Sequence, residues 1–168
     1  MHTLKPVLII ALFSLAITPT VAYAAPGDPV LDAEERLFNI LINKHRVTNG
    51  RPPLPVSVSL TKAAKWLSTD MATQNYFSHT DSLGRTFTTR LAAFGYAYVT
   101  PKAENIAAGA PTAALAFAQW LASPGHNATM LSPSYTVMGI GWAYSATSPY
   151  KWYWTTTFGG YADRLVGT

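Results

Sequence analysis

Apolar residues recur at helical spacing in the first half of the chain and alternate at strand spacing in its last third. The pattern predicts a first helix over residues 32–47 and a second that begins after Ser59 as its N-cap and ends just before Phe77. Two more helices are predicted over 86–93 and 112–122, followed by a helical turn over 127–131. Strands are predicted over 96–99, 135–144 and 151–158. Because most predicted helices come first and most predicted strands come late, we expect one α+β domain built in layers. The sequence contains no internal repeat.

The same pattern predicts which faces are buried. In the first helix the inward stripe should consist of Leu37, Ile40 and Leu41. The helix over 112–122 is apolar almost all round, which predicts burial on most sides. The strand over 135–144 has one face of small residues, including Gly139 and Gly141, and this face should receive a closely packed neighbour.

The first residues have the features of a secretory leader. Lys5 precedes an apolar run over 7–17, and Ala22-Tyr23-Ala24 supplies a small-x-small cleavage site. An uncleaved membrane anchor is the alternative, but crossing a bilayer requires about 20 apolar residues. We therefore predict a signal peptide over 1–24, a flexible arm over 25–30 and a single domain over 31–168. The mature protein should be secreted and should have no transmembrane span.

Composition narrows the chemistry. The chain has no cysteine, which excludes disulfides, thiolate metal sites and thiol catalysis. Its net charge is +4 with no basic run, so we expect no nucleic-acid partner. Trp, Tyr and Phe are frequent and can bury large areas, so stability should come from packing. We expect a monomer.

The candidate functional residues are His79, Glu104 and His126, each predicted near the end of an element or in a loop. Imidazoles and carboxylates are the side chains best suited to metal binding or proton transfer. Alone, His79 could simply hydrogen-bond backbone, and Glu104 could be structural, accepting backbone N–H bonds or pairing with an imidazolium. Ser123 precedes a proline at a helix end, which is typical of local backbone bonding, so we assign it no nucleophilic role.

Several short motifs occur in an order that resembles the CAP superfamily of cysteine-rich secretory, antigen 5 and pathogenesis-related proteins, also called SCP-like domains. They are Asn43-x-x-Arg46, Phe77-Ser78-His79, Arg90 with Gly95, Glu104-Asn105-Ile106-Ala107, Trp120-x-x-Ser123-Pro124-Gly125-His126, Pro133-x-Tyr135, Gly139-Ile140-Gly141 and the closing 154–158. The lack of cysteine looks like the bacterial branch. The resemblance implies a three-layer α-β-α sandwich with a central, mainly antiparallel sheet and an open cleft.

The resemblance also implies roles for individual residues. His79 and His126 match the two cleft histidines and Glu104 the first cleft glutamate, whereas Ser123 stands where many eukaryotic members have a second glutamate. Two neutral imidazoles could hold Zn²⁺ or another divalent cation weakly. We expect a binding domain that takes an extracellular lipid, sterol or peptide in this cleft. The alternative is a metal-dependent extracellular hydrolase, a peptidase or a cell-wall or ester hydrolase, with Glu104 and His126 as its catalytic residues.

Overall fold

The computed structural model describes residues 27–167, so the predicted signal peptide lies outside the described residues. The helices are α1 (Ala33–Thr48), α2 (Val58–Gln74), α3 (Phe87–Ala93), α4 (Ala113–Ala122) and α5 (Pro124–Leu131). The strands are β1 (Lys102–Ala108), β2 (Val137–Tyr144) and β3 (Trp152–Gly159). Within the described part of the chain, no helix combines the length and the apolar character that crossing a bilayer requires.

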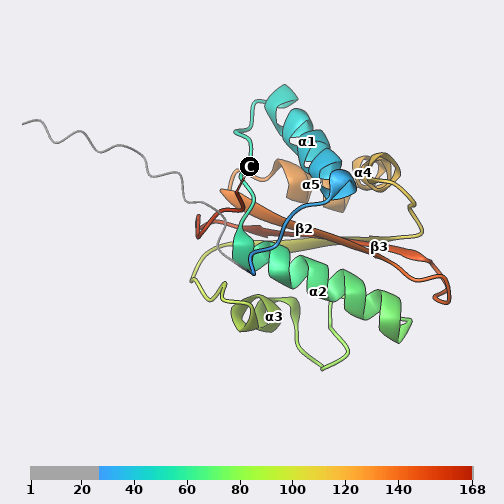
Figure 1. Cartoon of the computed structure of the whole chain (residues 1–168). Coiled ribbons are helices and arrows are strands. Elements are labelled where there is room, and N and C mark those ends of the chain that lie inside the picture. Colours follow the sequence, from blue (N-terminus) through green and yellow to red (C-terminus); the bar gives the residue numbers. More distant parts are fainter. Residues whose placement is uncertain (1–26, 168) are drawn as a thin grey trace, which may run out of the picture.

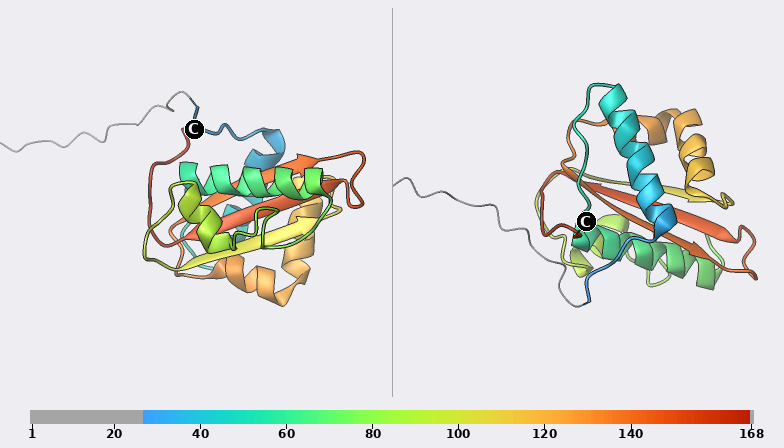
Figure 2. Two further views of the ribbon diagram at one scale, coloured as in Figure 1. Left: turned by 90° about the horizontal axis from the view of Figure 1, so that it is seen from below. Right: turned by 45° about the horizontal axis from the view of Figure 1, so that its top comes forward.

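The strands form one antiparallel sheet in the order β1-β3-β2, so the last strand of the chain lies in the middle. α2 and α3 cover one face, and α1, α4 and α5 cover the other (Figure 1). Two further views show the same three layers (Figure 2). The α+β prediction and the three-layer arrangement are therefore confirmed.

Polar side chains at the helix starts explain where the helices begin. Asp32 caps α1, and its carboxylate accepts from the N–H of Glu35 while the Glu35 carboxylate accepts from the N–H of Asp32. Ser57 caps α2, two residues before the predicted Ser59. Thr86 caps α3 in the same way. Each oxygen satisfies a backbone N–H that the helix itself leaves unpaired.

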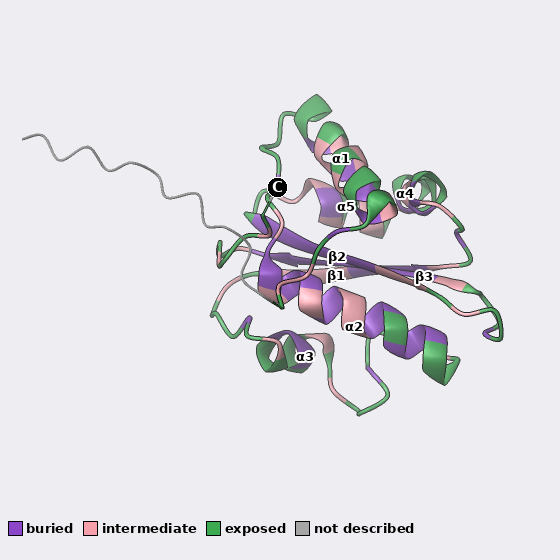
Figure 3. Ribbon diagram, in the orientation of Figure 1, coloured by how far each residue is buried: buried purple, intermediate pink, exposed green. Residues whose placement is uncertain are grey.

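The small face of β2 receives α2, as predicted. A Cβ atom added at Gly139 would lie 2.1 Å from the Leu60 carbonyl carbon, and one at Gly141 would lie 2.3 Å from the Lys65 backbone nitrogen. These distances leave no room for any side chain. The two glycines therefore set how closely the α2 backbone approaches the sheet. Leu60 and Ala64 of α2, which lie against these glycines, are fully buried (Figure 3).

The predicted inward stripe of α1 was wrong by one residue. Phe38 and Ile42 are fully buried, whereas Ile40 is 59% exposed. The stripe continues to Arg46, which is also fully buried and donates to the carbonyls of Pro52, Met130 and Ser132. A buried arginine on the inner face interrupts the apolar pattern from which the stripe was read.

Three further predictions need correction. α4 is buried only at Ala113, Ala116 and Trp120, while Leu115 is 51% exposed, because α4 is an outer helix that packs with one side. No strand forms over 96–99: Tyr96 is buried and hydrogen-bonds with residue 161, but the chain turns after it, and β1 begins only at residue 102. α5 begins at Pro124 rather than after His126, so His126 lies in its first turn.

Candidate functional site

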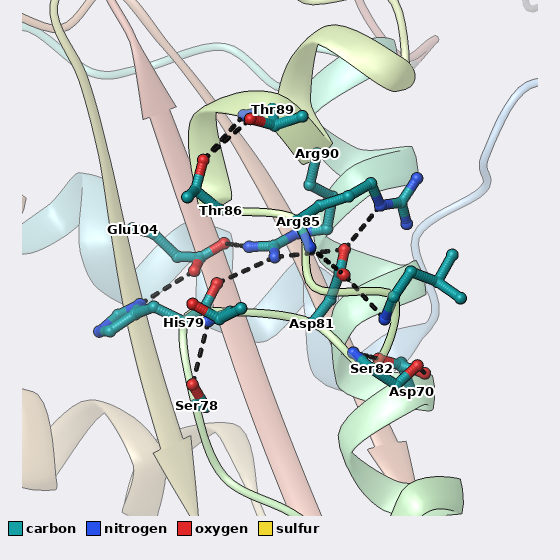
Figure 4. Close-up of polar contacts among 12 residues, drawn as sticks. Asp70, Ser78, His79, Asp81, Ser82, Arg85, Thr86, Thr89, Arg90 and Glu104 are labelled. Carbon is teal, nitrogen blue, oxygen red and sulfur yellow. Dashed lines mark hydrogen bonds and ion pairs between the residues drawn. The ribbon is translucent and has the colours of Figure 1, made fainter.

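The candidate residues lie on both sides of β1, which forms an edge of the sheet. Glu104 is on β1, and its side chain points to the face that carries the loop with His79 (Figure 4). The next residue, Asn105, points to the opposite face, where its amide donates to the His126 carbonyl oxygen at 3.0 Å. Successive residues of a strand alternate between faces. The β1 edge thus lies between the two histidine-bearing segments.

His79 and Glu104 form a direct pair. The His79 Nδ1 lies 2.9 Å from Glu104 Oε1, and the His79 side chain is 53% exposed while that of Glu104 is 1% exposed. An ionised carboxylate can only accept, so Nδ1 carries the proton, and in the neutral ring Nε2 keeps a lone pair. A histidine held in this way by a carboxylate is oriented like a metal ligand supported by a second residue.

Arg90 fixes the position of the Glu104 carboxylate. Its guanidinium is fully buried, donates from Nη2 to Glu104 Oε2 and from Nη1 to the His79 carbonyl oxygen, and lies 3.8 Å from Asp81 Oδ2. Both Glu104 oxygens are therefore engaged. Because the same arginine also holds the backbone of His79, one cation connects α3, β1 and the loop after α2.

His126 is held by a different set of groups on the other face. Its Nδ1 lies 2.9 Å from Ser123 Oγ, and its ring stacks on Trp120 with centroids 5.9 Å apart. Burial, and to a smaller extent the charge of His79, lower the pKa of His126 below its ordinary value. When Ser123 Oγ accepts from Nδ1–H, the Nε2 of His126 also keeps a lone pair.

The lowered pKa predicts a pH effect on stability. The unfolded chain binds a proton at His126 more readily than the folded one, so in metal-free buffer the free energy of unfolding should fall as pH drops below about 6.5. Urea unfolding at pH 7.5 and 5.0 should show a larger loss for the wild type than for His126→Asn. An equal loss of unfolding free energy in both proteins would contradict the assignment of this pH effect to His126.

The expectation of local backbone bonding by Ser123 is corrected: its hydroxyl does not cap α5 but bonds to His126. His45 lies nearby and is half-buried: its Nε2 lies 2.8 Å from Asn127 Oδ1 and its ring contacts Phe117. These contacts join α1 to α5 and α4 behind His126.

The sequence reasoning assigned no role to Arg90, Asp81 or Asn105, although they hold the candidate residues in place. Arg90 was present among the family motifs together with Gly95, and in the sequence it stands between threonines and the apolar run Leu91-Ala92-Ala93. Among residues 27–167, no group of three or more His, Asp or Glu is placed to hold a metal ion. A cavity of about 730 Å³ lies elsewhere, between α1, residues 53–56 and residues 165–167.

One known protein of similar sequence comes from a bacterium. The chain is 34% identical over 131 residues to the uncharacterized protein YkwD of Bacillus subtilis (strain 168), covering 77% of this chain and 48% of that protein. It thus spans about half the length of this relative.

Two similar solved structures also come from bacteria. An extracellular protein containing an SCP domain from Bacillus anthracis str. Ames matches with a TM-score of 0.66 and 27% identity over 75% of this chain and 40% of that one. An outer surface protein from Borrelia burgdorferi matches with a TM-score of 0.68 and 18% identity over 80% and 99% of the two chains, which shows the fold alone. Residues 40–158 match the profile of the cysteine-rich secretory protein family, CAP. The chain therefore belongs to the CAP family.

Proposed function

We propose that this protein is a secreted CAP domain in which His79 and His126 together bind a divalent cation, with Zn²⁺ as the best candidate, beside a site for an extracellular ligand. The observation that carries the proposal is the Nδ1 contact of His79 with the buried Glu104 carboxylate, which leaves Nε2 of His79 as an acceptor. The charge of His79 contributes to the lowered pKa of His126, so the two rings are close enough to interact electrostatically.

The donor set fits a weakly held ion. Two imidazoles supply two ligands, and Glu104 adds none because Arg90 and His79 occupy both of its oxygens. Structural zinc sites have four protein ligands and catalytic sites usually have three. A bound cation would polarise a ligand oxygen or water at this position, while Glu104 and Arg90 hold the orientation of His79.

The hydrolase alternative has less support. A general base needs a free acceptor within hydrogen-bond reach of the attacking water. Glu104 is engaged on both oxygens, and Ser123 stands where a second carboxylate would be needed. The test is turnover of ester and peptide substrates by zinc-loaded protein. Turnover that His126→Ala abolishes without loss of fold would establish an enzyme.

Zinc should stabilise the folded protein in a pH-dependent way. At ten times its Kd a ligand that binds only the folded state contributes about 1.4 kcal/mol, which corresponds to a rise of about 4 °C in Tm for a domain of this size. The rise should be present at pH 7.5 and largely absent below about pH 5.5, because protonated imidazoles do not bind metal. Differential scanning fluorimetry with added Zn²⁺ measures both.

Variants separate this site from other histidines. The His79→Ala, His126→Ala double variant should lose the zinc response, whereas His45→Ala should keep it, because Asn127 and Phe117 surround His45 away from the pair. A zinc response that survives in the double variant would refute ligation by these two residues.

A further inference from the structure

The hydrogen bonds that flank β1 show which of its main-chain groups face away from the sheet. The Gly109 N–H donates to the Trp152 carbonyl at 2.9 Å, and the Gly160 N–H donates to the Pro101 carbonyl at 3.0 Å. Hydrogen-bonded pairs alternate along an antiparallel ladder. The odd-numbered residues of β1 therefore bond to β3, and its even-numbered residues direct their N–H and C=O groups outward.

The opposite edge of the sheet supports this assignment. The Ser145 N–H donates to the Lys151 carbonyl at 2.8 Å, so the even-numbered residues of β2 also face outward. Met138, an even-numbered residue, indeed donates to the Pro55 carbonyl at 3.0 Å and accepts from the Ser57 N–H at 2.8 Å. The chain thus covers part of the β2 edge with its own backbone.

The β1 edge is covered at one position and open at another. The Trp120 indole N–H donates to the outward carbonyl of Ile106 at 3.3 Å. Over residues 27–167, no hydrogen bond reaches the outward main-chain groups of Lys102 or Glu104. The Glu104 side chain is only 1% exposed, yet the residue as a whole is half-buried, so its accessible part is main chain.

We infer that this open edge, Lys102 to Glu104, binds an extended peptide segment, which adds to the sheet as a further strand. Main-chain pairing to an exposed edge is an established mode of peptide recognition. The inference deepens the proposed function, because the peptide would pass between the segments that carry His79 and His126. It rests on the same cluster of residues but needs no bound cation.

The chemistry of the edge favours a peptide over an apolar ligand. Unpaired N–H and C=O groups that an alkyl chain or a sterol ring covered would lose their water without gaining a partner, which costs free energy. A peptide supplies acceptors and donors at the same spacing. Successive side chains of an added strand would point alternately to the His79 face and to the His126 face.

The test uses a fluorescein-labelled heptapeptide of alternating Thr and Val and two N-methylated forms, measured by fluorescence anisotropy. Methylation at alternate residues leaves one hydrogen-bonding side intact, so the affinity should stay within about threefold. Methylation at every residue removes the donors on both sides, and the affinity should fall at least tenfold. Equal binding by the fully methylated peptide, or no binding by the parent peptide at millimolar concentration, would overturn the inference.

Protein variants locate the binding edge. Lys102→Pro removes an outward N–H without breaking a bond to β3, and proline is tolerated at such edge positions. It should weaken binding about five- to tenfold, while Lys102→Ala should stay within twofold. Tyr144→Pro makes the same change on the outward side of β2 and should leave the affinity unchanged. Equal weakening by Lys102→Pro and Tyr144→Pro would refute the assignment to β1.

Two further measurements keep the peptide and the cation separate. Bound peptide should slow hydrogen exchange at the Glu104 amide, and the anisotropy series should give the same result in EDTA. Peptide binding retained in a protein that shows no zinc response would refute the cation proposal alone. A zinc response without peptide binding would refute this inference alone.

Discussion

Arg90→Met should lower the free energy of unfolding by about 3 to 5 kcal/mol, the cost expected when one partner of a buried ion pair is removed. Arg90 is fully buried, and its loss would leave the Glu104 carboxylate, which is 1% exposed, without its guanidinium. The His79 carbonyl would also lose a donor. Urea denaturation followed by circular dichroism measures the effect.

A paired variant tests whether the unpaired charge causes this loss. Arg90→Met combined with Glu104→Leu removes both charges and should recover a large part of the stability. Arg85→Met is the control, because Arg85 also pairs with Asp81 but its side chain is 23% exposed. It should cost less than Arg90→Met, because Asp81 keeps the backbone N–H donors of Leu83 and residue 85 and lies 3.8 Å from Arg90. A double variant as unstable as Arg90→Met would show that the buried carboxylate is not the cause.

Gly141→Ala should destabilise the protein by about 3 kcal/mol or more. The new methyl group would lie 2.3 Å from the backbone nitrogen of Lys65 and 2.4 Å from its Cα, so the backbone of α2 would have to move away from β2. Thermal unfolding should show a Tm lower by about 6 °C or more.

Gly125→Ala is the matched control. Gly125 lies in α5, and a Cβ there meets no atom within 4 Å. Alanine favours a helix over glycine by about 0.5 to 1 kcal/mol, so this variant should be unchanged or slightly more stable. If Gly141→Ala cost as little as Gly125→Ala, close packing of α2 on β2 would not be required for stability.

Sequence periodicity predicted α2 and the β2–β3 pair well because their inner faces carry uninterrupted patterns. Leu60, Leu67 and Met71 repeat at helical spacing and are all fully buried. The buried stripe of α1 was predicted one residue out of place because Arg46 occupies a core position. The hydropathy pattern does not reveal that three backbone carbonyls accept hydrogen bonds from this buried guanidinium. β1 was not predicted as a strand because it alternates poorly: Asn105 is buried for its bond to residue 126 rather than for its apolar character.

The candidate site was predictable only in part. Family resemblance indicated His79, Glu104 and His126, and the structure places Glu104 against His79 directly. The choice of Arg90 as the partner of Glu104 depends on how α3 packs beside β1, which no local pattern encodes. The cation and the extracellular ligand remain predictions that the zinc and peptide experiments address.

The strand order has a consequence for biosynthesis. β1 and β2 do not pair with each other, and each finds its neighbour only in β3, residues 152–159. While a ribosome makes the chain, the sheet cannot assemble before residues 152–159 have been translated, because the central strand follows both edge strands in the sequence. The nascent polypeptide therefore lacks the middle layer of the fold until this strand has emerged.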